Sequence, residues 1–247
     1  MSSFICSLVL LLLAPLASCH GHHGGTVLVL GATGRTGSLL YKDLKKTSRH
    51  EVRALIRSTD KARDILGCDK CDESEGIYLG DITNVTSMIP AFEHVQTVAI
   101  ATGLSGRGSP TQEVIRSIEF DGIQNAVKAL AQETNIQAYG GVSNLRVVLC
   151  SSRGTTTPSS GVFGDILFYK LNAEVFLGSI GMTTSIVKPC GLSTQAGQNR
   201  TLKDREPKIY PALLSLPNGN GSNKMTRGSI RITTITIQRK ADVPCKN

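Results

Sequence analysis

Aromatic residues are scarce in this chain of 247 residues, and tryptophan is absent. Aromatic residues make up 4% of the sequence, so it offers no platform on which nucleic-acid bases could stack. The formal net charge of +8 does not alter this, because residues 198–247 carry ten Lys and Arg against three Asp and Glu. Residues 1–197 are almost neutral, with 17 against 16. We therefore predict no nucleic-acid partner, and we interpret residues 198–247 as a basic, poorly ordered tail.

Basic side chains are also missing from the N-terminal segment, where Phe4 to Ala14 is almost wholly apolar. Roughly ten apolar residues are too few to span a bilayer, but they suit the hydrophobic region of a signal peptide. We predict a signal peptide over residues 1–19 and entry into the secretory pathway. A plastid or another organelle, or an uncleaved membrane anchor, is the alternative. No further membrane span is expected.

The remaining part of the chain alternates between strand-like and helix-like patterns. About 225 residues suffice for one domain with a full core. Strands are predicted at 26–30, 52–56, 77–79, 95–101, 146–151 and 184–188, and helices at 36–47, 60–66, 84–92, 112–133 and 165–179. Nearly continuous apolar strands between helices indicate a parallel sheet that is covered on both faces. The predicted fold is α/β: a Rossmann-like, doubly wound domain over residues 24–197.

A glycine loop follows the first predicted strand and leads directly into the first predicted helix. Gly31 allows a sharp turn off the strand, Gly34 allows a backbone to approach a diphosphate, and Gly37 allows tight packing of helix on strand. The free N–H groups of the helix N-terminus favour phosphate binding. This strand–loop–helix context predicts a dinucleotide site that includes Thr33 and Thr36.

The end of the second predicted strand indicates which dinucleotide binds. An NAD site usually has an acidic residue here to accept from the ribose 2′-hydroxyl. This chain instead has Arg57 and Ser58, which can bind a 2′-phosphate, and Arg35 can approach that phosphate from the glycine loop. We therefore predict NADP as the cofactor, with NAD less favoured.

Five motifs in order resemble the atypical short-chain dehydrogenase/reductases, within them the NmrA-like and flavin/biliverdin-reductase-like group. They are the glycine loop, Arg57, Gly80-Asp81, the Ala99–Gly103 segment and Ser151-Ser152, and they are followed by Tyr169-Lys170 and by Lys188-Pro189-Cys190-Gly191. The resemblance covers about residues 26–192 and implies an NAD(P)-dependent oxidoreductase.

The resemblance also implies roles for individual residues. Asp81 would accept from the adenine amino group beside the Ile82 backbone, and Lys170 would bind the hydroxyls of the nicotinamide ribose. Other readings are that Asp81 caps a helix and that Lys170 is a solvated lysine. The cofactor site so predicted comprises Gly31, Thr33, Gly34, Arg35, Thr36, Gly37, Arg57, Ser58, Asp81, Ile82, Ala101, Thr102, Gly103, Lys170, Pro189 and Gly191.

The tyrosine that acts as the acid in the wider superfamily is missing. It would stand four residues before Lys170, where this chain has Ile166, and Tyr169 points about 100° away on a helix. The candidate catalytic residues are therefore Ser151, Ser152 and Lys170, with the proton supplied by a serine, the solvent or the substrate. We expect a reductase of a small carbonyl, quinone or flavin-like acceptor; the alternative is a non-catalytic regulatory or scaffold protein of the same fold.

The end of the chain departs from the family pattern. Residues 237–243 resemble the start of the family's last segment, but the final helix that usually follows is not found. We therefore expect an incomplete substrate region. No partner is predicted beyond an unidentified small-molecule substrate, and no oligomeric state.

Seven cysteines are present, but no two pairs have the spacing of a zinc site. Cys68 and Cys71 have C-x-x-C spacing, which is compatible with a small disulfide loop or with two free thiols. Cys150 and Cys190 end predicted strands and are expected to be small buried residues. No metal site is predicted.

Overall fold

The computed structural model describes residues 24–104, 108–189, 209–210 and 232–235. Four predicted features lie outside these residues: the signal peptide, most of the tail, Cys190 and Gly191.

A parallel sheet forms the centre of the molecule. Its first six strands are β1 (Gly24–Leu30), β2 (His50–Ile56), β3 (Ile77–Leu79), β4 (Val95–Ile100), β5 (Arg146–Cys150) and β6 (Thr183–Val187). They lie in the order β3-β2-β1-β4-β5-β6 and all pair in parallel. Each lies within two residues of its predicted position, and the predicted doubly wound Rossmann-like fold is confirmed.

Two short strands from residues 198–247 extend this sheet. β8 (Ile232–Ile235) pairs in parallel with β6, and β7 (Ile209–Tyr210) pairs antiparallel with β8. The sequence analysis assigned no strand to this region and is corrected for these six residues. The other residues of the predicted tail lie outside the described ranges.

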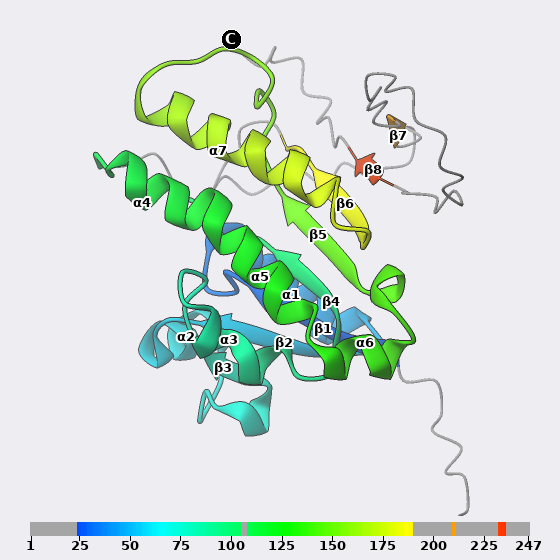
Figure 1. The fold of residues 1–247 in the computed structure, drawn as a ribbon. Coiled ribbons are helices and arrows are strands. Elements are labelled where there is room, and N and C mark those ends of the chain that lie inside the picture. Colours follow the sequence, from blue (N-terminus) through cyan, green and yellow to red (C-terminus); the bar gives the residue numbers. More distant parts are fainter. Residues whose placement is uncertain (1–23, 105–107, 190–208, 211–231, 236–247) are drawn as a thin grey trace, which may run out of the picture.

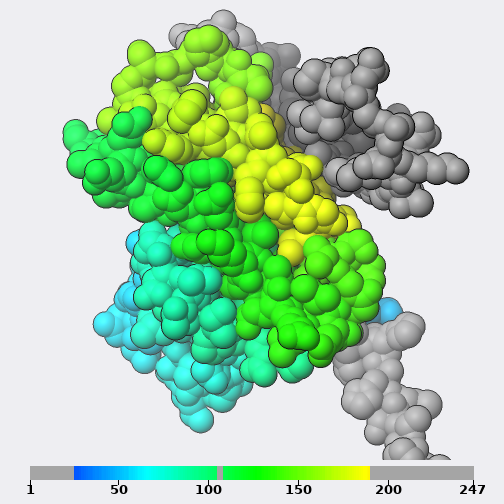
Figure 2. Space-filling view, in the orientation of Figure 1, coloured from blue at the N-terminus to red at the C-terminus, as the bar shows by residue number. Residues whose placement is uncertain are grey.

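Helices cover both faces of the sheet because its strands are apolar on both sides. Val29 of β1 packs with Tyr41 of α1 (Arg35–Thr47) and Ala62 of α2 (Thr59–Leu66). Leu28 and Leu30 face the opposite side, which is covered by α3 (Val85–Phe92), α5 (Gly122–Leu130) and α7 (Gly161–Leu177). Figure 1 shows α5 and α7 in front of the sheet and α1 behind it, and Figure 2 shows the side chains of α5 and α7 on the near face.

The predicted helix over 112–133 is in fact interrupted. α4 (Gln112–Arg116) runs into one π-helical turn, Ser117–Asp121, before α5 begins. α5 ends at Leu130, and a separate helix follows, α6 (Glu133–Tyr139), which the sequence analysis missed. α7 begins four residues before its predicted start. Short 3₁₀ turns occur at Glu73–Glu75 and Val142–Asn144.

The first turn of α1 packs on the end of β1 so closely that only glycine fits. A Cβ added to Gly37 would lie 2.1 Å from the carbonyl oxygen of Gly31 and 2.7 Å from its carbonyl carbon. Both atoms belong to the backbone, which has little room to move.

We expect Gly37→Ala to lower the free energy of unfolding by about 1–3 kcal/mol, because the added methyl group overpacks this contact. Urea denaturation measures the change. A useful comparison is Gly67→Ala, where the added Cβ meets nothing within 4 Å and only the φ of +75° is unfavourable. Its cost should be limited to about 1–2 kcal/mol of backbone strain. A Gly37→Ala protein as stable as the parent would contradict the close packing.

Candidate functional site

The predicted site residues gather at one edge of the sheet, where the parallel strands end. Gly31 follows β1, Arg57 follows β2, Ala101 follows β4, Ser151 follows β5 and Pro189 lies two residues beyond β6. The strand order reverses between β1 and β4, and ligands of open α/β sheets bind in the crevice at such a point. The site is therefore centred on the ends of β1 and β4.

The glycine loop and the segment after β4 are in direct backbone contact. A Cβ on Gly31 would lie 2.8 Å from the carbonyl oxygen of Ala101 and 2.9 Å from the amide nitrogen of Thr102. Gly31 has φ +75°, and its carbonyl accepts a 2.8 Å bond from the Gly34 N–H. Because Gly31 has no Cβ, its turn brings the glycine loop and the segment after β4 together at the place where the strand order reverses.

The start of α1 is suited to a diphosphate. Gly34 precedes the helix with an extended conformation and no side-chain cap. No acidic residue occupies the first helical turn, where a carboxylate would compete with phosphate. The helix dipole and its first N–H groups therefore remain available to an anion.

The groups predicted to bind the 2′-phosphate lie on the surface at the adjoining strand end. Arg57 and Ser58 are exposed after β2, and Arg35 is exposed as the first residue of α1. The Ser58 hydroxyl oxygen caps α2 by accepting a 3.3 Å bond from the Lys61 N–H. This bond occupies a lone pair, so the hydroxyl hydrogen can still be donated to a ligand.

Asp81 follows β3 and stabilises a turn. Its Oδ1 accepts 2.8 Å bonds from the N–H and the hydroxyl of Thr83. The cap of α3 is Asn84, whose side chain accepts from the Ser87 N–H. The alternative that Asp81 caps this helix is therefore wrong. Ile82 is buried, and its carbonyl accepts from Asn125.

Lys170 reaches the site from α7 and is held by Glu119. Its Nζ lies 2.8 Å from Glu119 Oε2, and the two side chains are 12% and 3% exposed. Glu119 Oε1 also accepts a 2.7 Å bond from the Leu104 N–H, and Lys170 Nζ would lie 3.3 Å from a Cβ on Gly103. The ion pair thus fixes the segment after β4, and Lys170 is not the solvated lysine considered as the alternative.

Glu119 was not among the predicted residues, although the sequence carried a signal. Ile115, Glu119 and Ile123 are spaced by four, so all three lie on one helical stripe. A charged residue on an otherwise apolar stripe needs a buried partner. Glu119 lies within the π-helical turn, a feature that often marks functional sites.

The two candidate serines have different surroundings. Ser151 is 5% exposed, and its hydroxyl donates a 2.5 Å bond to Glu174 Oε1. Ser152 is half-buried, and its hydroxyl donates to the Arg153 carbonyl at 3.1 Å. Both hydroxyl hydrogens are therefore already donated, but the bond from Ser152 to a neutral carbonyl is longer and weaker than the bond from Ser151 to a carboxylate, so Ser152 can be redirected to a ligand at lower cost.

A second acid–lysine pair supports Ser151. Lys188 Nζ lies 2.8 Å from Glu174 Oε2 and donates to the Thr155 hydroxyl, which itself bonds Glu174. Glu174 lies one helical turn after Lys170, so one stripe of α7 holds both pairs. The sequence analysis quoted Lys188 for its resemblance but gave it no role.

A buried hydroxyl at the site lacks a partner among the described residues. Thr102 Oγ1 is buried and makes no hydrogen bond there. Buried polar groups are nearly always paired, so this atom favours a polar ligand beside the Ala101–Gly103 segment. Pro189 is half-buried, and its carbonyl accepts from the Arg153 N–H at 3.1 Å, which joins the segments after β5 and β6.

Cys150 ends β5 close to this edge. Burial raises the pKa of its thiol, and the Lys170 ammonium acts in the opposite direction. The thiol is a small side chain that is half-buried, whereas the sequence predicted it to be buried.

The strand order and this edge together define an NAD(P)-binding protein of the Rossmann type. The chain belongs to the NAD(P)H-binding family, whose model matches residues 31–211. It is a member of the atypical short-chain dehydrogenase/reductase-like group, so the resemblance predicted from the five motifs is confirmed. The family is oxidoreductase-like and binds NAD(P).

Two plant proteins are similar to this chain over much of its length. Sanguinarine reductase of Eschscholzia californica is 29% identical over 224 residues, which cover 79% of this chain and 78% of the reductase. An uncharacterised chloroplastic protein of Arabidopsis thaliana is 31% identical over 188 residues. That match covers 72% of this chain but only 56% of the Arabidopsis protein.

Solved structures share the fold at low sequence identity. A short-chain dehydrogenase from Streptomyces avermitilis has a TM-score of 0.54 at 17% identity, over 70% of this chain and 68% of its own. A short-chain dehydrogenase from Burkholderia cenocepacia in complex with NADP has a TM-score of 0.51 at 17% identity. The match covers 68% of this chain and 72% of the dehydrogenase. These likenesses support the fold alone.

Within the described ranges, no helix combines the length and apolar character needed to cross a bilayer.

The Lys170–Glu119 pair should be strongly coupled. Lys170→Met leaves an unpaired buried carboxylate, so we expect a loss of about 3 kcal/mol in the free energy of unfolding. Adding Glu119→Gln should recover more than half of that loss, because the amide carries no charge. Lys128→Met, which changes an exposed lysine of α5, is the control and should be nearly neutral. Urea denaturation of the parent, the Lys170→Met and Glu119→Gln single variants, the double variant and the control measures the coupling, and additive losses would contradict it.

Proposed function

We propose that this protein is an NADP(H)-dependent reductase of a small carbonyl, quinone or flavin-like acceptor. The observation that carries the proposal is the Lys170–Glu119 pair, which holds a buried ammonium against Gly103 at the end of β4. In this family's arrangement, that position meets the nicotinamide ribose. The similarity to a plant protein named as a reductase supports the same class of reaction.

The residues present fit the cofactor. The Cβ-free contact of Gly31 with Ala101, the uncapped start of α1 and the unpartnered Thr102 hydroxyl together form a cradle for ribose and diphosphate. Arg57, Ser58 and Arg35 can surround a 2′-phosphate, and Asp81 can approach the adenine amino group. Ser151 and Pro189 complete the nicotinamide end in this proposal, and Gly191, which was predicted with them, lies outside the described residues.

Bound NADPH would supply a hydride, and the acceptor then needs one proton. Ile166 is 3% exposed and has no proton to give. Tyr169 directly precedes Lys170 on α7, so the two side chains leave the helix about 100° apart, and the Tyr169 ring packs against the exposed Phe168 with ring centres 5.2 Å apart. Ser152 or a solvent molecule is the remaining donor, and Lys170 positions the cofactor rather than activating a phenol.

A non-catalytic regulatory protein is the second candidate. The observation in its favour is the replacement of the tyrosine acid by the buried Ile166. The two candidates differ in turnover but not in cofactor binding. For location, two chloroplastic relatives from Arabidopsis thaliana support the plastid among the predicted alternatives.

NADPH should bind more tightly than NADH by about 1.5–3 kcal/mol, which is the range for a charge-assisted hydrogen bond. Arg57→Ala should remove most of that preference and leave NADH affinity nearly unchanged. Arg63→Ala is the matched control, because Arg63 is an exposed arginine of α2 that pairs with Asp60 instead. Calorimetric titration with both cofactors measures the difference. Equal affinities of the parent protein for NADPH and NADH would refute NADP preference.

Loss of NADPH absorbance should accompany incubation with at least one acceptor from a panel of quinones, flavins, aldehydes and sanguinarine. Tyr169→Phe should keep the rate within a few-fold of the parent, because its hydroxyl is not at the site. A loss of about a thousandfold, the range for removal of a general acid, would restore a tyrosine mechanism. Tight NADPH binding without turnover on any acceptor would favour the regulatory candidate.

A further inference from the structure

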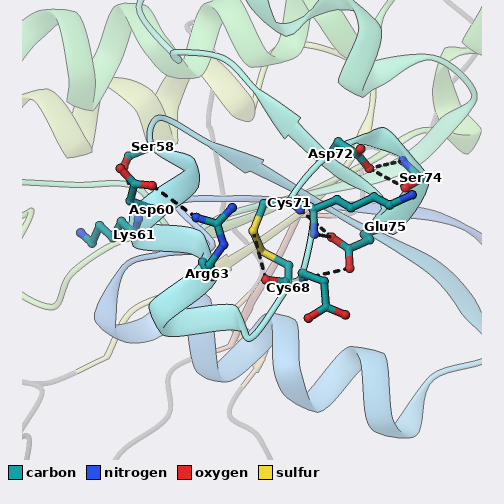
Figure 3. The surroundings of a disulfide bond; sticks show 11 residues. Ser58, Asp60, Lys61, Arg63, Cys68, Cys71, Asp72, Ser74 and Glu75 are labelled. Carbon is teal, nitrogen blue, oxygen red and sulfur yellow. Dashed lines mark hydrogen bonds and ion pairs between the residues drawn. A yellow bond between two sulfur atoms is a disulfide. The ribbon is translucent and has the colours of Figure 1, made fainter.

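The Cys68–Cys71 pair forms a disulfide (Figure 3) in the loop between α2 and β3, which precedes β3 rather than following a strand end. The C-x-x-C spacing in the sequence was equally compatible with a disulfide and with two free thiols. Cys68 is 9% exposed and Cys71 is 4% exposed, and both pack in the apolar core beneath α1 and α2. Both cysteines are therefore mostly covered, and Cys68 is the more exposed of the two.

A shallow hollow of about 410 Å³ opens beside Cys68. Its lining includes Cys68, Tyr41 and Glu75, and three lysines of α1: Lys42, Lys45 and Lys46. Cys71 is not part of the lining. A small molecule that enters the hollow thus meets the Cys68 side of the disulfide.

The hollow carries an excess of positive charge. Three lysines face one carboxylate, that of Glu75, and Lys45 Nζ stands 5.7 Å from the centre of the Tyr41 ring. Burial raises the pKa of the Tyr41 phenol, so the phenol stays neutral. The lining therefore favours a negatively charged solute, while the carboxylates of Asp69, Asp72 and Glu73 in the adjoining loop act in the opposite direction.

Glu75 is directed at the backbone of the disulfide loop. Its carboxylate accepts from the N–H groups of Cys71 at 2.5 Å, Lys70 at 2.9 Å and Asp69 at 3.1 Å, as Figure 3 shows. The bonds from Cys71 and Asp69 contribute most to lowering the pKa of this carboxyl. Asp72 adds bonds to Ser74 next to it. These bonds hold the loop backbone without help from the disulfide, so opening the sulfur–sulfur bond leaves the hollow in place.

We propose that this hollow is a thiol–disulfide exchange site for small anionic thiols, with Cys68 Sγ as the sulfur that is attacked. The incoming thiolate forms a new sulfur–sulfur bond to Cys68 while the Cys68–Cys71 bond breaks. The electron pair leaves on Cys71, whose thiolate takes a proton from water. One disulfide is replaced by another, so no oxidant or reductant is consumed. Attack by the Cys71 thiolate on the mixed disulfide reverses the step.

Three thiols of the same two-carbon length test the role of charge. 2-Mercaptoethanesulfonate is anionic, 2-mercaptoethanol is neutral and cysteamine is cationic. Each is incubated with the full chain at low ionic strength, quenched with acid, and the mixed disulfide is located by peptide mass. Each rate is divided by the rate of the same thiol with bis(2-hydroxyethyl) disulfide, which removes differences in intrinsic reactivity.

We expect the anionic thiol to react about tenfold faster than the neutral one after this correction, and the cationic thiol to react more slowly. Salt should reduce the preference, because the lysines are exposed. Lys45→Gln should reduce it as well, whereas Lys61→Gln should not, since Lys61 lies on α2 outside the hollow. Cys150→Ser should leave the exchange unchanged.

Several outcomes would overturn the proposal. One is equal corrected rates for the three thiols, which would remove the selection by charge. Another is a mixed disulfide on Cys71 in place of Cys68. A disulfide that exchanges only after the chain is unfolded would make it a structural crosslink. None of these results depends on cofactor binding or on turnover.

Discussion

The contact between Gly31 and the backbone of Ala101 and Thr102 is the constraint on which the site depends. It joins the end of β1 to the segment that follows β4. The two backbones lie so close that a Cβ on Gly31 would clash with Ala101 and Thr102. Gly37 packs on the carbonyl of Gly31 from the helix side, so strand, turn and helix meet at one point. The free N–H groups of α1 then face the same crevice as the segment after β4, which is the arrangement that a dinucleotide requires.

Helix α7 supplies the second support through two largely buried acid–lysine pairs on one stripe. Lys170 with Glu119 holds the segment after β4, and Glu174 with Lys188 holds those after β5 and β6. Buried charges are tolerated only when they are paired, and their geometry admits few alternative arrangements. These two pairs therefore fix the position of the loops that form this edge of the site. The absence of the tyrosine acid leaves this framework intact, because Ile166 occupies the same stripe as a buried apolar residue.

The strands and the location of the site were predictable because they follow from local patterns. Apolar runs between glycine and polar breaks place β1 to β6, and parallel strands bring their carboxyl ends to one edge. The pairing partners of Lys170 and Ser151 were not predictable from spacing, since Glu119 is distant in sequence from Lys170 and Glu174 from Ser151, and each pair meets only in the folded chain. The apolar stripe of Ile115 and Ile123 marks Glu119 as needing a buried partner, but it identifies neither that partner nor the π-helical turn in which Glu119 lies. β7 and β8 are too short for their alternation to stand out.

Amide hydrogen exchange with and without NADP⁺ tests the location of the cofactor most directly. Peptides that cover the glycine loop, Arg57 and the Ala101–Gly103 segment should exchange more slowly when NADP⁺ is bound, because the ligand contacts their backbone or orders it. Peptides around the Cys68–Cys71 loop should not change. Protection confined to that loop, or no protection under saturating NADP⁺, would contradict a cofactor site at the carboxyl ends of β1 and β4.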